Sequence, residues 1–190
     1  CSYYLFRILY FSLHQTISYF MVKKHLRTDW LKELKKIASE KRASAPRAAA
    51  IRMRPSKYKN WKKIYHLVIL PTYKEDKEII KESLQALVNS DYPKEKLIVV
   101  LALEKRGGRQ AREVVKTIKK EYADKFFRFL AAIHPDNIKG EITGKGSNVA
   151  WAGKEAKEII DSLKIPYKNI LVSSFDIDTK VYPQYFSCLT

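Results

Sequence analysis

The clearest chemical signal in the sequence is the triplet Asp176-Ile177-Asp178, which follows a short apolar run. In an extended segment alternate side chains share a face, so the two carboxylates are predicted to point the same way. Converging carboxylates repel each other unless a cation lies between them or one binds a proton. Mg²⁺ and Mn²⁺ prefer oxygen ligands and often bridge a carboxylate and a diphosphate. Asp176 and Asp178 are therefore candidate metal ligands, and because an Asp-x-Asp triplet alone is weak evidence, its position at the end of a strand is what supports this role.

A second signal is a lysine bracketed by glycines, Gly144-Lys145-Gly146, ahead of a helical pattern. We expect Ser147 to cap that helix. Backbone amides at a helix start and an ammonium group together favour an anion, so Lys145 is a candidate phosphate contact, with a plain turn as the alternative. The spacing differs from that of the phosphate-binding loop of nucleotide hydrolases.

Acidic residues also follow two other apolar runs. The segment from Pro71 to Asp76 (PTYKED) follows one run, and Glu104 follows the next. Glu75 and Asp76 can equally be acids at a helix N-terminus, and Glu104 can be half of a surface salt bridge. His134, after a third run, is more often a satisfied strand-end histidine than a catalyst.

These residues are positioned by an alternation of strands and helices. The apolar runs span 64–70, 97–103, 126–133 and 170–175, and helical patterns lie between them. The order predicts an α/β fold, with a mainly parallel twisted sheet and helices on both faces. In such sheets ligands bind at the carboxyl ends of the strands, where the acidic residues occur.

The N-terminal part has a different character. Residues 3–22 are rich in aromatic and aliphatic side chains and precede a basic run, as at the cytosolic end of a membrane segment. A spanning helix needs ~20 mainly apolar residues, and polar residues interrupt this one, so an interfacial or truncated span competes with a full span and with a buried helix. We expect residues 1–27 to be membrane-associated.

Residues 28–60 are predicted to form a basic amphipathic helix, capped by Thr28, and a proline-containing linker over 44–55. Basic amphipathic helices beside an apolar segment often lie on lipid. The predicted organisation is thus 1–27, 28–60 and an α/β domain over 61–190.

Charge follows the same division. The net charge is +17, and residues 1–63 hold 16 Lys and Arg against 3 acidic residues, whereas residues 64–190 hold 21 against 17. Clustered cations suit an anionic membrane surface or a nucleic acid. The two cysteines, Cys1 and Cys188, form no zinc-binding pattern or disulfide framework, which fits a reducing cytosolic setting.

Residues 64–186 resemble the family 2 glycosyltransferases, which have the glycosyltransferase-A fold. The matching pieces occur in the family's order: a strand then Pro-Thr-Tyr-Lys-Glu, a strand then an acidic residue, Gly-Lys-Gly-Ser-Asn-x-Ala at a helix start, and a strand then Asp-x-Asp. The resemblance implies that a nucleotide sugar contacts the four segments. The implied binding residues are Thr72 and Glu75 toward the nucleoside, with Pro71 and Tyr73 also among the nucleotide-sugar contacts, Glu104 toward the base, Lys145 and Asn148 toward the diphosphate and sugar, and Asp178 toward the metal with Asp176 beside it.

Two positions depart from the family pattern. Lys74 stands where the family commonly has Asn, and Glu104 stands where it commonly has Asp, without the usual Asp-Gly-Ser after it. A longer carboxylate shifts the base contact, so a UDP-type and a GDP-type donor both remain open.

The resemblance implies an inverting, divalent-metal-dependent transfer from a nucleotide sugar to a lipid-linked or polysaccharide acceptor at the cytosolic face of a membrane. In the family the catalytic base and the Gln-x-x-Arg-Trp-type segment of polymerising members follow the Asp-x-Asp, and we expect the base beyond Thr190. The expected partners are a membrane lipid surface, a nucleoside-diphosphate sugar donor and a glycan or lipid acceptor. Nucleic acid is not an expected partner.

Two other functions are considered. A metal-dependent nucleotidyltransferase also uses paired aspartates, but it needs a glycine-rich loop after the first strand, where Pro71-Thr72-Tyr73 lies instead. A nucleic-acid-binding module needs its positive charge on the face of the α/β domain, whereas most of it lies in the N-terminal third.

Overall fold

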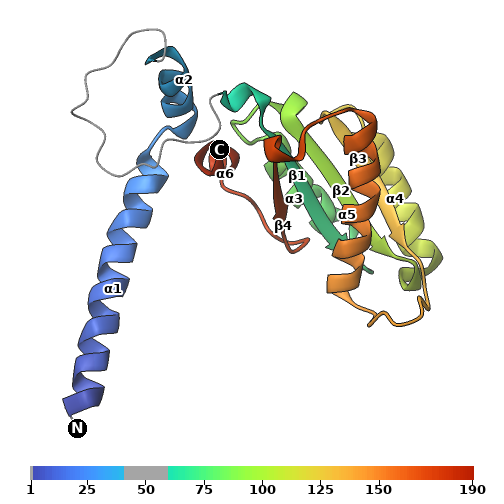
Figure 1. The fold of residues 1–190 in the computed structure, drawn as a ribbon. Coiled ribbons are helices and arrows are strands. Elements are labelled where there is room, and N and C mark those ends of the chain that lie inside the picture. Colours follow the sequence, from blue (N-terminus) through green and yellow to red (C-terminus); the bar gives the residue numbers. More distant parts are fainter. Residues whose placement is uncertain (1, 41–59) are drawn as a thin grey trace.

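The computed structural model describes residues 2–40 and 60–190, so the predicted linker over 44–55 lies outside the described residues. Figure 1 shows the arrangement. The α-helices are α1 Ser2–Arg27, α2 Trp30–Glu40, α3 Lys77–Val88, α4 Gly108–Tyr122, α5 Lys145–Ser162 and α6 Tyr185–Leu189, and the strands are β1 Tyr65–Thr72, β2 Leu97–Glu104, β3 Arg128–His134 and β4 Ile170–Ser174. Short 3₁₀ turns occur at Trp61–Lys63, Lys94–Lys96, Lys105–Gly107 and Tyr167–Asn169.

The four strands form one parallel sheet in the order β3-β2-β1-β4. In register, His66 lies opposite Leu97, and Tyr65 lies opposite Ile170. The chain therefore adds strands on one side of β1 and then returns to its other side for β4. The predicted α/β fold with a parallel sheet is confirmed.

Both faces of the sheet are covered by helices. Along β1, Val68 and Leu70 belong to a core formed with α3, α4 and α6, whereas Leu67 and Ile69 face α5. The α5 side contributes Ala152, Ala156 and Ile160, whose two small side chains let the helix lie close to the strands. This two-sided burial explains why β1 and β2 are continuous apolar runs rather than alternating ones.

Several predicted strand boundaries differ from the observed ones by one or two residues, among them those at Phe126 and Phe175. Phe126 precedes β3 and packs in the α3/α4 core as part of a turn, and Phe175 follows the end of β4. Both side chains are apolar because they are packed against the core, which does not require strand geometry.

Helix α1 is exposed along its whole length, and none of its residues is buried. Its large side chains, such as Phe6 and Tyr3, leave about 70% of their surface open. Within the described residues, no helix combines the length and the apolar character that crossing a bilayer demands.

Helix α2 packs against the α/β domain. Leu34 is buried in the same core as α6, and the backbone amide of Trp30 donates to Gln184 just before α6. The tyrosine hydroxyl of Tyr182 donates to the carbonyl of Leu26 over 2.7 Å. Leu34, on the apolar face of α2, therefore contacts protein.

The start of α2 also differs from the predicted cap. Asp29 accepts a hydrogen bond from the amide of Lys32 over 2.9 Å, which is the N-cap contact, while the Thr28 hydroxyl donates back to the carbonyl of Lys24 in α1. Thr28 thus finishes α1, and Asp29 begins α2.

Candidate functional site

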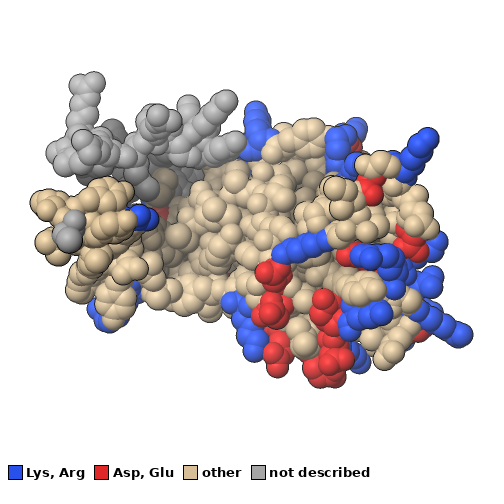
Figure 2. Space-filling view, turned by 90° about the horizontal axis from the view of Figure 1, so that it is seen from below, with Lys and Arg blue, Asp and Glu red and all other residues tan. Residues whose placement is uncertain are grey.

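The candidate site lies at the carboxyl edge of the sheet, beside β1. Strands β1 and β4 are neighbours, so the loops that follow them open at the same edge of the sheet, beside the first turn of α5. Open parallel sheets bind ligands at the carboxyl ends of their strands. Figure 2 looks toward the end of the domain where α5 begins and shows acidic and basic side chains interspersed on it.

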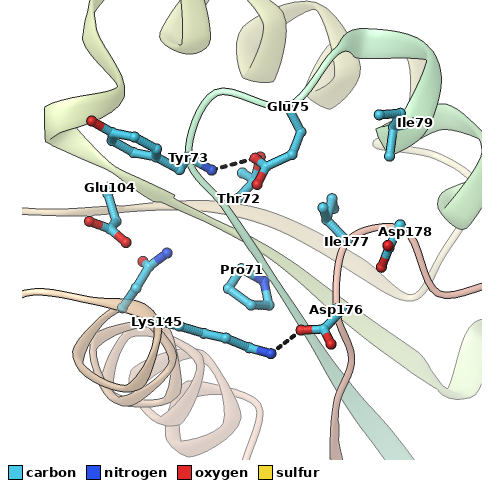
Figure 3. A pocket seen from close by; sticks show the side chains of 11 residues that line it. Pro71, Thr72, Tyr73, Glu75, Ile79, Glu104, Lys145, Asp176, Ile177 and Asp178 are labelled. Carbon is cyan, nitrogen blue, oxygen red and sulfur yellow. Dashed lines mark hydrogen bonds and ion pairs between the residues drawn. The ribbon is translucent and has the colours of Figure 1, made fainter.

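A cavity of about 380 Å³ opens at this edge. Segments that are far apart in the sequence line it (Figure 3): the end of β1 and its loop, the end of β2, the first turn of α5 and the loop after β4. Its lining residues are Pro71, Thr72, Tyr73, Glu75, Ile79, Glu104, Lys145, Asn148, Asp176, Ile177 and Asp178. All nine residues named as ligand contacts from the sequence are in this set.

The loop after β1 is closed by Glu75. Its carboxylate accepts hydrogen bonds from the Thr72 hydroxyl, over 2.6 Å, and from the backbone amide of Tyr73. Burial acts to raise the pKa of Glu75, but these hydrogen bonds outweigh it and hold the pKa below its ordinary value. Glu75 is therefore a fixed carboxylate that shapes the loop.

The loop after β2 contacts the β1 loop from the side. A Cβ atom added to Gly107 would lie 2.2 Å from the carbonyl oxygen of Tyr73, so only glycine allows this approach. The Glu104 carboxylate is nearly buried and pairs with the Nε and Nη2 groups of Arg106. The guanidinium in turn lies 5.4 Å from the centre of the Tyr73 ring.

The first turn of α5 supplies a cation and backbone amides. The helix begins at Lys145 rather than after Ser147, so the prediction that Ser147 is the N-cap was wrong. Ser147 lies in the first turn, and its hydroxyl accepts from the amide of Gly144 over 3.1 Å and donates to the carbonyl of the same residue. Gly144 has φ 153°, in the range that favours glycine.

Asn148, one turn further, is buried between the helix and β2. Its Nδ2 donates to the carbonyl of Ala102 over 2.7 Å, while its Oδ1 is buried without a hydrogen-bond partner among the described residues. Asn148 thus fixes α5 to the sheet beneath the cavity and retains one free acceptor.

The Asp-x-Asp segment is a turn and not an extended strand. The amide of Thr179 bonds to the carbonyl of Asp176 over 2.9 Å, and Ile177 is buried in the core. Asp176 pairs with Lys145, and Asp178 lies apart from that ion pair in Figure 3. The prediction that the two carboxylates share one face of a strand was therefore wrong, because the strand ends at Ser174.

The carboxylates of Asp176 and Asp178 do not form a preassembled site for a divalent cation. The described residues contain no group of three or more His, Cys, Asp or Glu side chains able to hold a metal. Asp178 is exposed and makes no hydrogen bond or ion pair in the described part of the chain. Mg²⁺ is commonly held by one or two carboxylates together with substrate phosphates and water. The site fits a cation that arrives with a phosphate ligand, rather than one held by protein alone.

Three cavity features were not found from the sequence. Ile79 and Ile177 give the cavity apolar walls, and Arg106 neutralises Glu104. The position of Arg106 two residues after a strand-end acid is a signal, since a nearly buried carboxylate needs a counter-charge. His134, as its more common role suggests, is a satisfied strand-end residue: its Nε2 lies 3.1 Å from Glu141 and its ring contacts Trp151.

The solved structures that resemble this chain include two of TarS from S. aureus. No protein-family model matches the chain, and no curated protein matches it significantly in sequence. The crystal structure of residues 1–349 of TarS from S. aureus aligns with 22% identity over 66% of this chain and 31% of that one, with a TM-score of 0.47. The same TarS fragment in complex with UDP-GlcNAc aligns with 22% identity over 66% of this chain and 30% of that one, with a TM-score of 0.44. The chain thus spans about a third of the length of those structures.

Proposed function

We propose that the cavity binds a nucleoside-diphosphate sugar and that the protein is a glycosyltransferase of the family 2 type. The observation that carries the proposal is the convergence of the nine residues Pro71, Thr72, Tyr73, Glu75, Glu104, Lys145, Asn148, Asp176 and Asp178 on one cavity. They come from four segments that are far apart in the sequence.

The side chains that line the cavity offer separate contacts for the base, the diphosphate and the cation of such a donor. The Tyr73 ring and the Glu104–Arg106 pair offer an aromatic face, an acceptor and a donor for a nucleobase. Lys145 and the first-turn amides of α5 offer positive charge for a diphosphate. The exposed carboxylate of Asp178 offers oxygen for a cation bound to that diphosphate.

The reaction would be an inverting displacement at the anomeric carbon of the donor sugar. A bound Mg²⁺ or Mn²⁺ would offset the charge on the departing nucleoside diphosphate. Lys145 contributes positive charge at the same place, and Asn148 and Glu75 hold the surrounding loops in position. The acceptor hydroxyl would also need a general base to remove its proton.

Association with the cytosolic face of a membrane forms part of the proposal. Helix α1 exposes aromatic and aliphatic side chains on all sides and ends in Lys24, His25 and Arg27. An apolar helix followed by cations suits the boundary between acyl chains and anionic head groups. A lipid-linked or polysaccharide acceptor would then be reached at that surface.

On the face shown in Figure 2, acidic side chains lie beside basic ones, and the nucleic-acid alternative would need a continuous basic surface there. The loop after β1 argues against a nucleotidyltransferase, because Thr72 and Glu75 close it through a carboxylate instead of leaving backbone amides free for a triphosphate.

Calorimetric titration tests the proposal. The 190-residue chain would be titrated with UDP, GDP, ADP and the UDP- and GDP-linked sugars, with Mn²⁺ and with EDTA. We expect one base to be preferred, Mn²⁺ to strengthen binding, and Asp178→Ala to remove that Mn²⁺ effect. Asp124→Ala is the matched control, because Asp124 is also an exposed aspartate in a turn and lies outside the cavity. A folded chain that binds none of these nucleotides would refute the proposal.

A further inference from the structure

Lys145 and Asp176 form an ion pair that spans the cavity. The lysine is the first residue of α5 and the aspartate follows β4, so the pair joins two of the four segments that line the cavity (Figure 3). The lysine and aspartate side chains are 57% and 66% exposed, respectively. The pair therefore lies at the open side of the cavity, in contact with solvent.

The fold does not depend on this ion pair. Gly144 and Ser147 cap α5 through their own hydrogen bonds, and Asn148 ties the helix to β2. The loop after β4 is held separately, because the carbonyl of Ile177 accepts a hydrogen bond from Ser83. Solvent-exposed ion pairs contribute little to stability and separate at little cost.

An anion that enters the cavity meets both members of the pair. Lys145 is the cation at the N-terminus of a helix, where an anion is favoured, whereas Asp176 repels the anion and holds the ammonium group. Asp176 is thus an internal competitor of any phosphate ligand for the same cation.

We propose that Lys145 changes partner on donor binding, from Asp176 in the free protein to the diphosphate in the complex. This inference rests on the proposed function and deepens it. The exchange releases the Asp176 carboxylate, which then becomes available to a divalent cation that accompanies the diphosphate, together with Asp178. Asp176 consequently opposes nucleotide binding when no divalent cation is present and supports it when one is.

The exchange predicts opposite signs for one substitution under two conditions. In EDTA, Asp176→Asn in the 190-residue chain should bind UDP or GDP, whichever the wild type prefers, about two- to five-fold more tightly, because the ion pair that must be broken is a weak, exposed one. In Mn²⁺ the same variant should bind more weakly than the wild type. Calorimetry measures both.

A double-mutant cycle separates partner exchange from a general change in charge. Lys145→Met should weaken binding in EDTA, and adding Asp176→Asn to Lys145→Met should then give no further gain. Asp178→Asn removes one negative charge from the same cavity without freeing Lys145, so any small gain it causes should persist in the Lys145→Met background.

The outcomes separate this inference from the proposed function. If the wild type binds nucleotide but Asp176→Asn leaves affinity in EDTA unchanged or lowers it, the exchange is wrong and the proposed function stands. A gain from Asp176→Asn that survives in the Lys145→Met background also refutes the exchange. If neither the wild type nor Asp176→Asn binds any nucleotide, with or without Mn²⁺, both proposals fail.

Discussion

Gly107 lies directly against the carbonyl oxygen of Tyr73, so that the loop after β2 and the loop after β1 touch through bare backbone. Any Cβ at residue 107 would lie 2.2 Å from that oxygen, well inside contact distance. The backbone of Gly107 itself has φ −58°, which every residue adopts, so the requirement for glycine comes from this contact alone.

Gly107→Ala should therefore displace the Tyr73 loop and lower the free energy of unfolding by about 1–3 kcal/mol, as overpacking does. Urea unfolding followed by circular dichroism measures the change. Gly153→Ala is the matched control, because a Cβ there meets nothing within 4 Å and alanine favours the helix. Equal stability of Gly107→Ala and the wild type would show that the two loops part freely.

His66 should make the protein sensitive to acid. It is buried between Tyr92 and Phe186, and burial lowers its pKa to about 4. The unfolded chain binds the proton near pH 6.5, so between that pH and about 4 the unfolded state holds more protons and stability falls as pH falls. The loss amounts to roughly 3 kcal/mol at most.

The measurement is urea unfolding at several pH values for the wild type and for His66→Phe. The phenylalanine keeps the packing but carries no titratable group, so the difference between the two curves isolates the histidine. Parallel curves from pH 7 to 4 would contradict a neutral, buried His66.

Glu75 should contribute in the same direction over a lower pH range. Its pKa lies below the ordinary value, so its stabilisation is present above about pH 4.5 and is lost as pH falls through the depressed folded-state pKa. Glu75→Gln keeps an acceptor for Thr72 but not the charge. The variant should be less stable than the wild type at pH 7, and the gap should close in acid, as thermal unfolding will report.

Asn148→Ala should destabilise the protein by about 1–3 kcal/mol, because the buried carbonyl of Ala102 loses its side-chain partner. Asn148→Asp should cost at least as much, since a carboxylate cannot donate to that carbonyl. Gln110→Ala on the exposed face of α4 is the control. An unchanged midpoint in urea for Asn148→Ala would mean that this hydrogen bond contributes nothing to the attachment of α5.

Helix α1 should bind lipid. We expect the chain to co-sediment with vesicles of phosphatidylcholine and phosphatidylglycerol, and Leu9→Glu with Leu13→Glu to weaken this binding about ten-fold or more, since each leucine adds on the order of 2 kcal/mol when buried. Val172→Glu, an exposed apolar residue of β4, is the control. Undiminished binding of the double variant would exclude α1 as the lipid contact.

Much of the fold was predictable because its determinants are local. The apolar runs that became β1 and β2 are buried on both faces, so their composition alone marks them as strands of a covered parallel sheet. Because ligands bind at the carboxyl ends of strands in such sheets, Thr72, Glu104 and Asp176 were predicted to lie at one site, and all three line the cavity.

The predicted caps at Thr28 and Ser147 were wrong because of local contacts, whereas other features depend on contacts distant in sequence. Asp176 and Asp178 were expected on one face because an extended strand was assumed, but Ile177 turns into the core toward Ser83 and ends that geometry. Leu34 of α2 is covered by α6, which lies some 150 residues later in the chain. The local sequence around Ile177 or Leu34 does not identify Ser83 or α6 as its partner.

The attachment of α2 to α6 has a consequence for how the molecule unfolds. Phe186 and Thr190 of the C-terminal segment contact His66 on β1, while Gln184 and Tyr182, just before α6, hold the junction of α1 and α2. Loss of α6 would therefore uncover the sheet and Leu34 in one event. The second helix should melt in the same cooperative transition as the sheet, despite the long stretch of chain between them.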